Sequence, residues 1–140
     1  MMSAAEKLLE SLYYEVIPMK GFEEKLDVLT AGDRVGITCS PKQGLQVTLD
    51  TVAKLSYRGF SLTPHVAARQ VMSKQHLKDI VSQLTDSGIT SIFVPGGDLD
   101  EPMGEYESSA AVLRDLAEMD HPFNRIGIAS YPEGHPAISD

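Results

Sequence analysis

Cysteines, long apolar runs and clusters of basic residues are scarce in this chain of 140 residues. Cys39 is the single cysteine, so no intrachain disulfide can form and a reducing compartment is expected. No apolar run approaches the roughly 20 residues of a membrane span. Residues 1–12 lack the basic start and apolar centre of a signal peptide. We therefore expect a cytoplasmic protein that does not associate with membranes.

Several classes of function are disfavoured by missing motifs. The net charge is −8 and no stripe of Lys and Arg stands out, which argues against binding to nucleic acid. No strand is followed by a Walker loop or by G-x-G-x-x-G, and no Cys or His pair has zinc spacing, so we predict no metal site. A nucleophile elbow is also missing. The length suits one domain over residues 1–140.

What is present is an alternation of strand and helix patterns. Short apolar runs predict strands at residues 13–18, 35–39, 60–66, 89–94 and 125–129. Helical spacing predicts a leading helix at 4–12 and further helices near 22–32, 45–59, 73–88 and 108–117. This order is typical of right-handed βαβ units with a parallel sheet. Because the strand runs are continuously apolar, both faces of the sheet are predicted to be covered.

Polar and titratable side chains follow every predicted strand. They are Glu15, Thr38, His65, Asp98 and, after the fifth strand, Tyr131, Glu133 and His135. The carboxyl ends of parallel strands share one edge of the sheet, which predicts a common site there. Each residue also has a structural interpretation: His65 as a hydrogen-bonded loop residue, Asp98 as a turn cap, and Glu15 as a solvated edge residue.

The predicted chemistry is proton transfer to a flat polar ligand. Glu15 is expected to be walled by Tyr14, Val16 and Ile17, and this desolvation would favour the neutral form of a general acid. Gly96 and Gly97 would let backbone approach a ligand closely. Cys39 is more typical of a buried structural thiol than of a nucleophile.

Five short motifs occur in order along the chain. They are Tyr-Glu-Val-Ile-Pro at 14–18, Ile-Thr-Cys-Ser-Pro at 37–41, Pro-His-Val at 64–66, Gly-Asp-Leu at 97–99 and Tyr-Pro-Glu-Gly-His-Pro at 131–136. With them the chain resembles the methylenetetrahydrofolate reductase family, over nearly all of its length and over the first half of the family's domain. The resemblance implies a (β/α) barrel of TIM type, of which about five βα units with parallel strands are present as a partial barrel.

The function that the resemblance implies is the reduction of 5,10-methylenetetrahydrofolate to 5-methyltetrahydrofolate in one-carbon metabolism and methionine biosynthesis. It implies FAD at the carboxyl-end face and NADH or NADPH as the reductant. By motif, Glu15 matches the acid that protonates the folate, and Asp98 matches the aspartate near flavin and pterin. Flavin-contacting positions are matched by Thr38, His65, Asp98, Tyr131 and His135.

The chain departs from the family pattern at several positions. Val16, Ile17 and Met19 replace aromatic and proline residues of the first strand. Gly96 stands where the family commonly has an arginine, which predicts a weaker contact to a flavin phosphate. Two other functions stay open: another folate-linked methyl-transfer enzyme, and a non-catalytic half-barrel fragment or folate/flavin-binding module.

Five parallel strands cannot close an eight-stranded barrel, so we expect unpaired sheet edges. Such a half-barrel is predicted either to self-associate as a homo-oligomer or to be marginally stable. The structural alternative is a flat, flavodoxin-like sheet with reordered strands.

Overall fold

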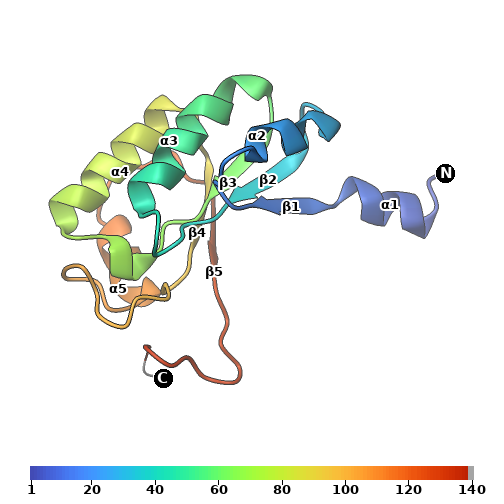
Figure 1. Cartoon of the computed structure of the whole chain (residues 1–140). Coiled ribbons are helices and arrows are strands. Elements are labelled where there is room, and N and C mark those ends of the chain that lie inside the picture. The colour runs from blue at the N-terminus through green and yellow to red at the C-terminus, as the bar shows by residue number, and fades with distance from the viewer. Residues whose placement is uncertain (139–140) are drawn as a thin grey trace.

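A computed structural model describes residues 1–138, which form a mixed α/β fold with parallel strands (Figure 1). The strands are β1 Tyr13–Val16, β2 Arg34–Ile37, β3 Ser61–Pro64, β4 Ser91–Val94 and β5 Arg125–Ile128. All five predicted strands are confirmed, although each keeps only four residues. The residues lost from their ends lie in the connecting loops.

The helices follow the predicted order, although those predicted at 4–12, 22–32 and 45–59 end early, the last in a 3-10 turn at Ser56–Arg58. They are α1 Ala4–Glu10, α2 Phe22–Lys25, α3 Leu45–Leu55, α4 Lys74–Asp86 and α5 Ser109–Leu116. The helix expected over residues 22–32 is wrong in length, because α2 passes at once into a 3-10 turn at Leu26–Val28. Leu26 is the only buried residue of these two elements, so little packing supports a longer helix there.

Helix α4 shows how a local pattern sets an element. Its buried residues are Leu77, Ile80, Val81 and Leu84, which recur at helical spacing. At the start, the Ser73 hydroxyl accepts a hydrogen bond from the backbone N–H of His76 at 3.1 Å. At the end, Gly88 takes a φ of 72°, which stops the helix at little steric cost.

The strands stand side by side in sequence order. β1, β2 and β3 form one ladder and β4 and β5 another. A bridge between His65 and Phe93 joins the two ladders, with Val66 N–H donating to the Phe93 carbonyl at 2.8 Å. The flavodoxin-like alternative with reordered strands is therefore wrong.

The ladders are offset where they meet. Tyr13, Arg34 and Ser61 are level at the amino ends of the first three strands. The bridge of His65 with Phe93 places Ser91, the first residue of β4, beside Thr63 instead of Ser61. The strand register is thus shifted by two residues between β3 and β4.

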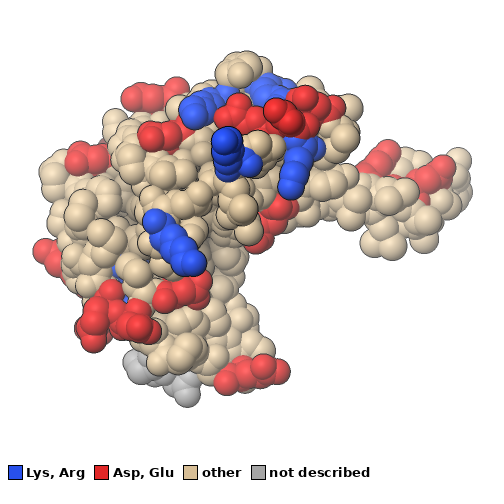
Figure 2. Space-filling view, viewed as in Figure 1, with Lys and Arg blue, Asp and Glu red and all other residues tan. Residues whose placement is uncertain are grey.

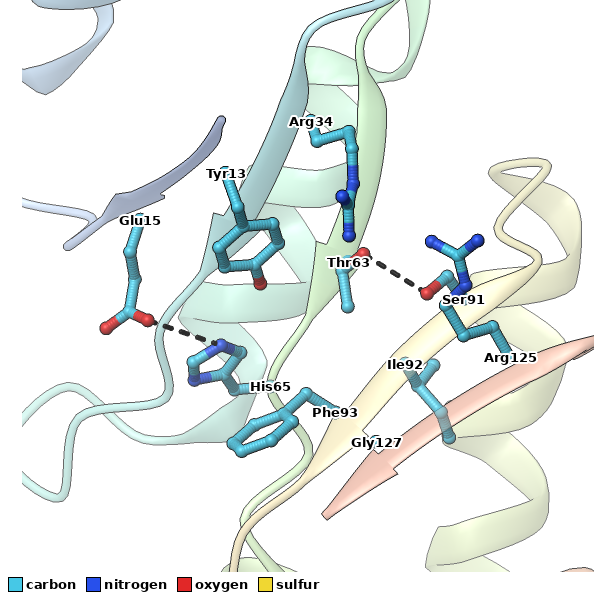
Figure 3. A pocket seen from close by; sticks show the side chains of 10 residues that line it. All are labelled: Tyr13, Glu15, Arg34, Thr63, His65, Ser91, Ile92, Phe93, Arg125 and Gly127. Carbon is cyan, nitrogen blue, oxygen red and sulfur yellow. Dashed lines mark hydrogen bonds and ion pairs between the residues drawn. The ribbon is translucent and has the colours of Figure 1, made fainter. Parts of the chain in front are cut away.

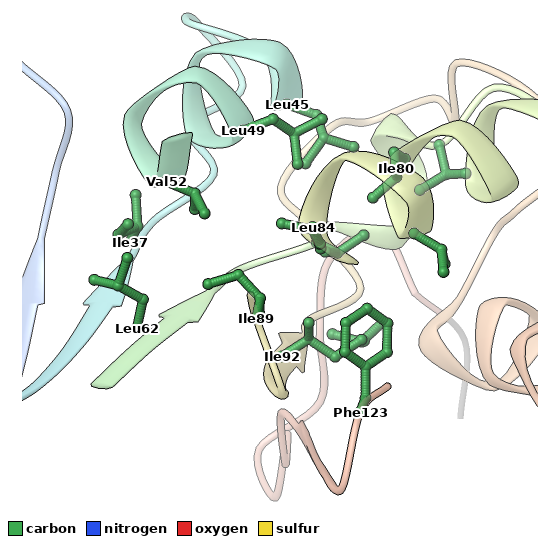
Figure 4. Close-up of a cluster of buried hydrophobic side chains, with 14 of the residues drawn as sticks. Ile37, Leu45, Leu49, Val52, Leu62, Ile80, Leu84, Ile89, Ile92 and Phe123 are labelled. Carbon is green, nitrogen blue, oxygen red and sulfur yellow. The ribbon is translucent and has the colours of Figure 1, made fainter. Parts of the chain in front are cut away.

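Only one face of the sheet is covered by helices. α3, α4 and α5 lie on the same side of the strands (Figure 1), and the core fills the space between them (Figure 4). Its strand residues are Val35, Ile37, Leu62, Ile92 and Val94, and its helix residues include Leu49, Val52, Leu77, Ile80 and Leu84. The prediction that both faces are covered is wrong, because polar residues and glycines occupy alternate strand positions and face away from these helices.

Both outer strands have a free edge in residues 1–138. β1 pairs only with β2 and β5 only with β4, so the predicted unpaired edges are confirmed in this part of the chain and no closed barrel forms there. α1 projects away from the body and buries none of its residues (Figure 1). No helix within the described residues is long and apolar enough to span a membrane.

Candidate functional site

The uncovered face of the sheet holds a cavity of about 260 Å³ (Figure 3). It is lined by Tyr13, Glu15, Arg34, Thr63, His65, Ser91, Ile92, Phe93, Arg125 and Gly127. The surface is visibly hollowed on this side, between the projecting α1 and the segment that follows β5 (Figure 2). We call this uncovered face, with its cavity, the open face.

Two glycines let aromatic rings lie close to the sheet on the open face. A Cβ atom on Gly36 would collide with the ring and hydroxyl of Tyr13, and one on Gly127 would press against the ring of Phe93. The side chains of β1 and β4 therefore spread over their neighbouring strands. The result is a cavity with the aromatic rings of Tyr13 and Phe93 in its walls.

Glu15 and His65 face each other across this cavity. Glu15 Oε2 lies 4.0 Å from His65 Nε2, and the His65 side chain is 12% exposed whereas that of Glu15 is 56% exposed. The His65 ring packs against Phe93 with 4.8 Å between ring centroids. Burial lowers the pKa of His65 from its usual 6.5, and the nearby Glu15 carboxylate opposes this shift to a smaller extent. His65 is therefore mainly neutral at pH 7 and able to exchange a proton.

The apolar wall predicted around Glu15 is present only in part. Successive residues of a strand point to opposite faces, so Tyr14 and Val16 lie on the other side of β1, where Val16 packs against the core. Glu15 also lines a second hollow of about 310 Å³, whose other residues are Val16, Ile17, Met19, Lys20, Phe22 and Lys25. The described residues leave this carboxyl group largely in water.

Asp98, Tyr131 and His135 form a separate group. Asp98 Oδ1 lies 3.7 Å from His135 Nε2, and the rings of Tyr131 and His135 meet with centroids 4.7 Å apart. The backbone N–H of Gly96 donates to the Tyr131 hydroxyl at 3.1 Å. The segment after β5 thereby folds back onto the end of β4.

The structure divides the predicted site into two groups on the same edge of the sheet. Glu15 lies within β1, one residue before its end, and the other residues of the two groups follow the carboxyl ends of β3, β4 and β5. The cavity that Glu15 and His65 line is not lined by Asp98, Tyr131 or His135. Asp98 is 81% exposed in its side chain, so it is open to solvent beside His135.

Thr38 and Cys39 follow β2. The Thr38 hydroxyl is buried and has no hydrogen-bond partner within residues 1–138. The backbone carbonyl of Thr38 accepts a hydrogen bond from the Thr48 hydroxyl at 2.9 Å. Cys39 packs against the core, and burial raises the pKa of its thiol, which fits a structural role better than a nucleophilic one.

Arg69 is a structural residue that the sequence did not reveal. It is 6% exposed, and its guanidinium donates to three backbone carbonyls, those of Leu99 at 2.8 Å, Asp100 at 2.7 Å and Glu107 at 3.0 Å. These contacts hold the loop that follows Asp98. An arginine in a loop is normally exposed to solvent, so no local sequence pattern indicates that Arg69 is buried.

No known protein-family model matches the chain. Within residues 1–138, no group of three or more His, Cys, Asp and Glu side chains is arranged to hold a metal ion.

Proposed function

We propose that the chain is a methylenetetrahydrofolate reductase-like part of a (β/α) barrel of TIM type. The sequence order of its parallel strands and the helices on one face support this architecture. The two-residue step between β3 and β4 supports it further, since a sheet can close into a barrel only if its register is staggered.

The observation that carries the functional proposal is the pair Glu15 and His65 on the open face. In the proposed reaction, Glu15 donates a proton to the amine nitrogen of the five-membered ring of 5,10-methylenetetrahydrofolate as its C–N bond breaks. The iminium carbon that forms accepts a hydride from NADH or NADPH and becomes the methyl group. Neutral His65 orients the carboxyl group and exchanges protons with it, which is the usual task of a base paired with an acid.

The described residues do not fit the FAD that the resemblance implies. The Tyr131 hydroxyl and the Nδ1 atom of His135 already accept backbone N–H groups, from Gly96 and Ala137 respectively. The Ile138 side chain lies against Gly96 and fills the space in front of this glycine. Arg69 is 6% exposed and uses each guanidinium nitrogen to hold a backbone carbonyl, so it is not presented to a flavin phosphate at the surface. The proposed reaction therefore uses no flavin.

A second candidate is a folate-binding module without turnover. Its specific support is the 56% exposure of Glu15, because the described residues do not exclude water from the acid. Folate would then bind beside His65 and Phe93 without being reduced.

The test combines a visible absorption spectrum, a folate-binding titration and an assay of reduced-nicotinamide oxidation with and without 5,10-methylenetetrahydrofolate. We expect no flavin band and an oxidation that depends on the folate. Glu15→Gln should lower turnover by about 10²-fold while folate still binds, since the amide cannot release a proton. Glu10→Gln, at the exposed end of α1, is the matched control and should behave like the unmodified chain.

Each outcome separates the candidates. Folate binding without any turnover supports the second candidate, and the absence of both rejects both. A Glu15→Gln variant with full turnover removes Glu15 from the mechanism. A stoichiometric flavin band contradicts the argument against FAD.

A further inference from the structure

Four neighbouring strands each place one polar side chain on the floor of the open face. Arg34 comes from β2, Thr63 from β3, Ser91 from β4 and Arg125 from β5. Figure 3 shows Arg34 extended toward Thr63 and the Arg125 guanidinium beside Ser91. We call these four residues the arginine-hydroxyl cluster.

The step in register brings the two hydroxyl groups of the cluster together. Since β4 starts level with the third residue of β3, Thr63 Oγ1 donates to Ser91 Oγ at 3.2 Å. Ser91 is also directly paired with Arg125 in the ladder of β4 and β5. Because the Thr63 proton is used in this bond, the Ser91 hydroxyl keeps its own proton for another acceptor.

Neither arginine has an acidic partner within residues 1–138. No ion pair joins Arg34 or Arg125 to a carboxylate, in contrast to Arg58, whose guanidinium meets Asp27 at 2.8 Å. The only carboxylate that lines the cavity is Glu15, which faces His65. The cluster therefore presents two cations without a counter-charge.

The arginines are also directed toward the cavity. The Tyr13 ring lies 5.7 Å from the Arg34 guanidinium carbon, a cation–π distance, and so holds Arg34 over the sheet. A guanidinium offers N–H donors in a planar fork that matches the two oxygens of a carboxylate or phosphate. The cavity measures about 260 Å³, which suits a compact ligand.

We propose that the arginine-hydroxyl cluster is a binding site for a compact oxyanion, either a carboxylate or a phosphate group. The two guanidinium groups neutralise the anion from opposite sides, and the Ser91 hydroxyl donates to it from the sheet floor. The cluster lines the same cavity as Glu15 and His65. None of its four residues takes part in the proposed proton transfer, so variants of the cluster and variants of Glu15 test the two proposals separately.

In the experiment, the full chain is titrated with each probe at an ionic strength held constant with chloride. Binding is measured by calorimetry and by NMR of the backbone amides. Inorganic phosphate is one probe and glutarate is the other. We expect saturable binding of at least one of them, with the largest amide shifts at Thr63, Ser91 and Gly127. The stronger of the two probes distinguishes a phosphate site from a carboxylate site.

Variants decide whether the cluster is responsible. Arg34→Gln and Arg125→Gln should each weaken binding by about 10-fold or more, because each removes a charged donor. Arg125→Lys keeps the charge without the fork and should weaken binding less, which preserves the test if the glutamine variant folds poorly. Arg114→Gln, exposed on α5, is the control and should bind like the unmodified chain.

The proposal is overturned by weak, non-saturable binding of both probes. It is also overturned if Arg34→Gln and Arg125→Gln bind as tightly as the Arg114→Gln control. In either case the two arginines are structural cations of the open face, and the assignment of Glu15 is unaffected.

Discussion

The two faces of one small sheet differ sharply, although the same strands build both. On the helix-covered face, Val35, Ile37 and Val94 are 0% exposed. On the open face, the neighbouring positions hold Glu15, whose side chain is 56% exposed, and the polar Thr63. Because alternate residues of a strand point in opposite directions, each strand supplies stability on one side and chemistry on the other.

This comparison predicts where substitutions are costly. Removing apolar atoms from the covered face leaves a cavity in a packed core. Substitutions on the open face change groups that already meet solvent, so they should alter binding or proton transfer more than folding. The variants that follow test this division.

The largest effect is expected for Ile37→Ala on β2. The side chain is fully buried, so the variant should lose about 2–5 kcal/mol of unfolding free energy, measured by urea denaturation. Thr63→Ala, on the open face of the adjacent strand, should lose only about 1 kcal/mol, the value of its hydrogen bond to Ser91. Similar losses for the two variants would contradict the division between the faces.

Arg69→Met should cost about 2–4 kcal/mol. The substitution removes a buried charged donor and leaves three carbonyls without their partner. Arg114→Met, exposed on α5, should stay within about 0.5 kcal/mol of the unmodified chain.

Hydrogen exchange sharpens the test of Arg69. The backbone N–H of Met103 donates to the Arg69 carbonyl at 2.8 Å, so its protection reports on the loop after Asp98. We expect faster exchange of Met103 in Arg69→Met than in the control. Unchanged protection would mean that the three hydrogen bonds do not hold the loop.

Gly36→Ala should displace the Tyr13 ring at a cost of about 1–2 kcal/mol, because the new methyl group would occupy the position of the ring. In the native arrangement burial raises the pKa of Tyr13 above its usual 10. Release of the ring into water should bring this pKa back toward the ordinary value, which a titration followed by ultraviolet absorption detects. An unchanged Tyr13 titration would show that the ring does not depend on Gly36.

The smallest effect is a dependence of stability on pH that originates in His65. Burial lowers its pKa in the folded chain below 6.5, so the unfolded chain binds more protons and the contribution is lost as the pH falls below about 6.5. His65→Gln should flatten this part of the stability curve. A curve of unchanged slope would contradict the prediction.

NMR of the His65 ring separates the influence of its neighbour. The Glu15 carboxylate raises the pKa of His65 and so opposes the effect of burial. Glu15→Gln should therefore move the midpoint of the His65 titration further down. A midpoint that does not move would show that the contact across 4.0 Å has no electrostatic weight.

Local patterns predicted the elements well where their packing agreed with their periodicity. The apolar face of α4 and its Ser73 cap could be predicted from the sequence, because helical spacing and capping involve residues close in sequence. Residues 22–32 share a similar spacing, but only Leu26 is fully buried, while Phe22 and Leu29 are half-buried against the core and the helix stops early. A hydrophobic pattern predicts an element only as far as a partner surface exists for it.

The sequence predicted the edge of the sheet on which the candidate site residues lie, but not which of these residues are in contact. Strand order alone places Glu15, His65, Asp98 and His135 at carboxyl ends. Which of them meet depends on the bridge between β3 and β4 and on the turn of the chain after β5, and both are long-range. Hence Glu15 meets His65, whereas Asp98 meets His135.

The sequence by itself determined the alternation of strands and helices, the parallel sheet and the chemical groups at its edge, because periodicity, caps and glycines act over a few residues. Only the tertiary structure decided which face stays open, how far the register steps between β3 and β4, and that Arg69 is buried. These properties arise from contacts between residues far apart in the chain, whose energies no local pattern records.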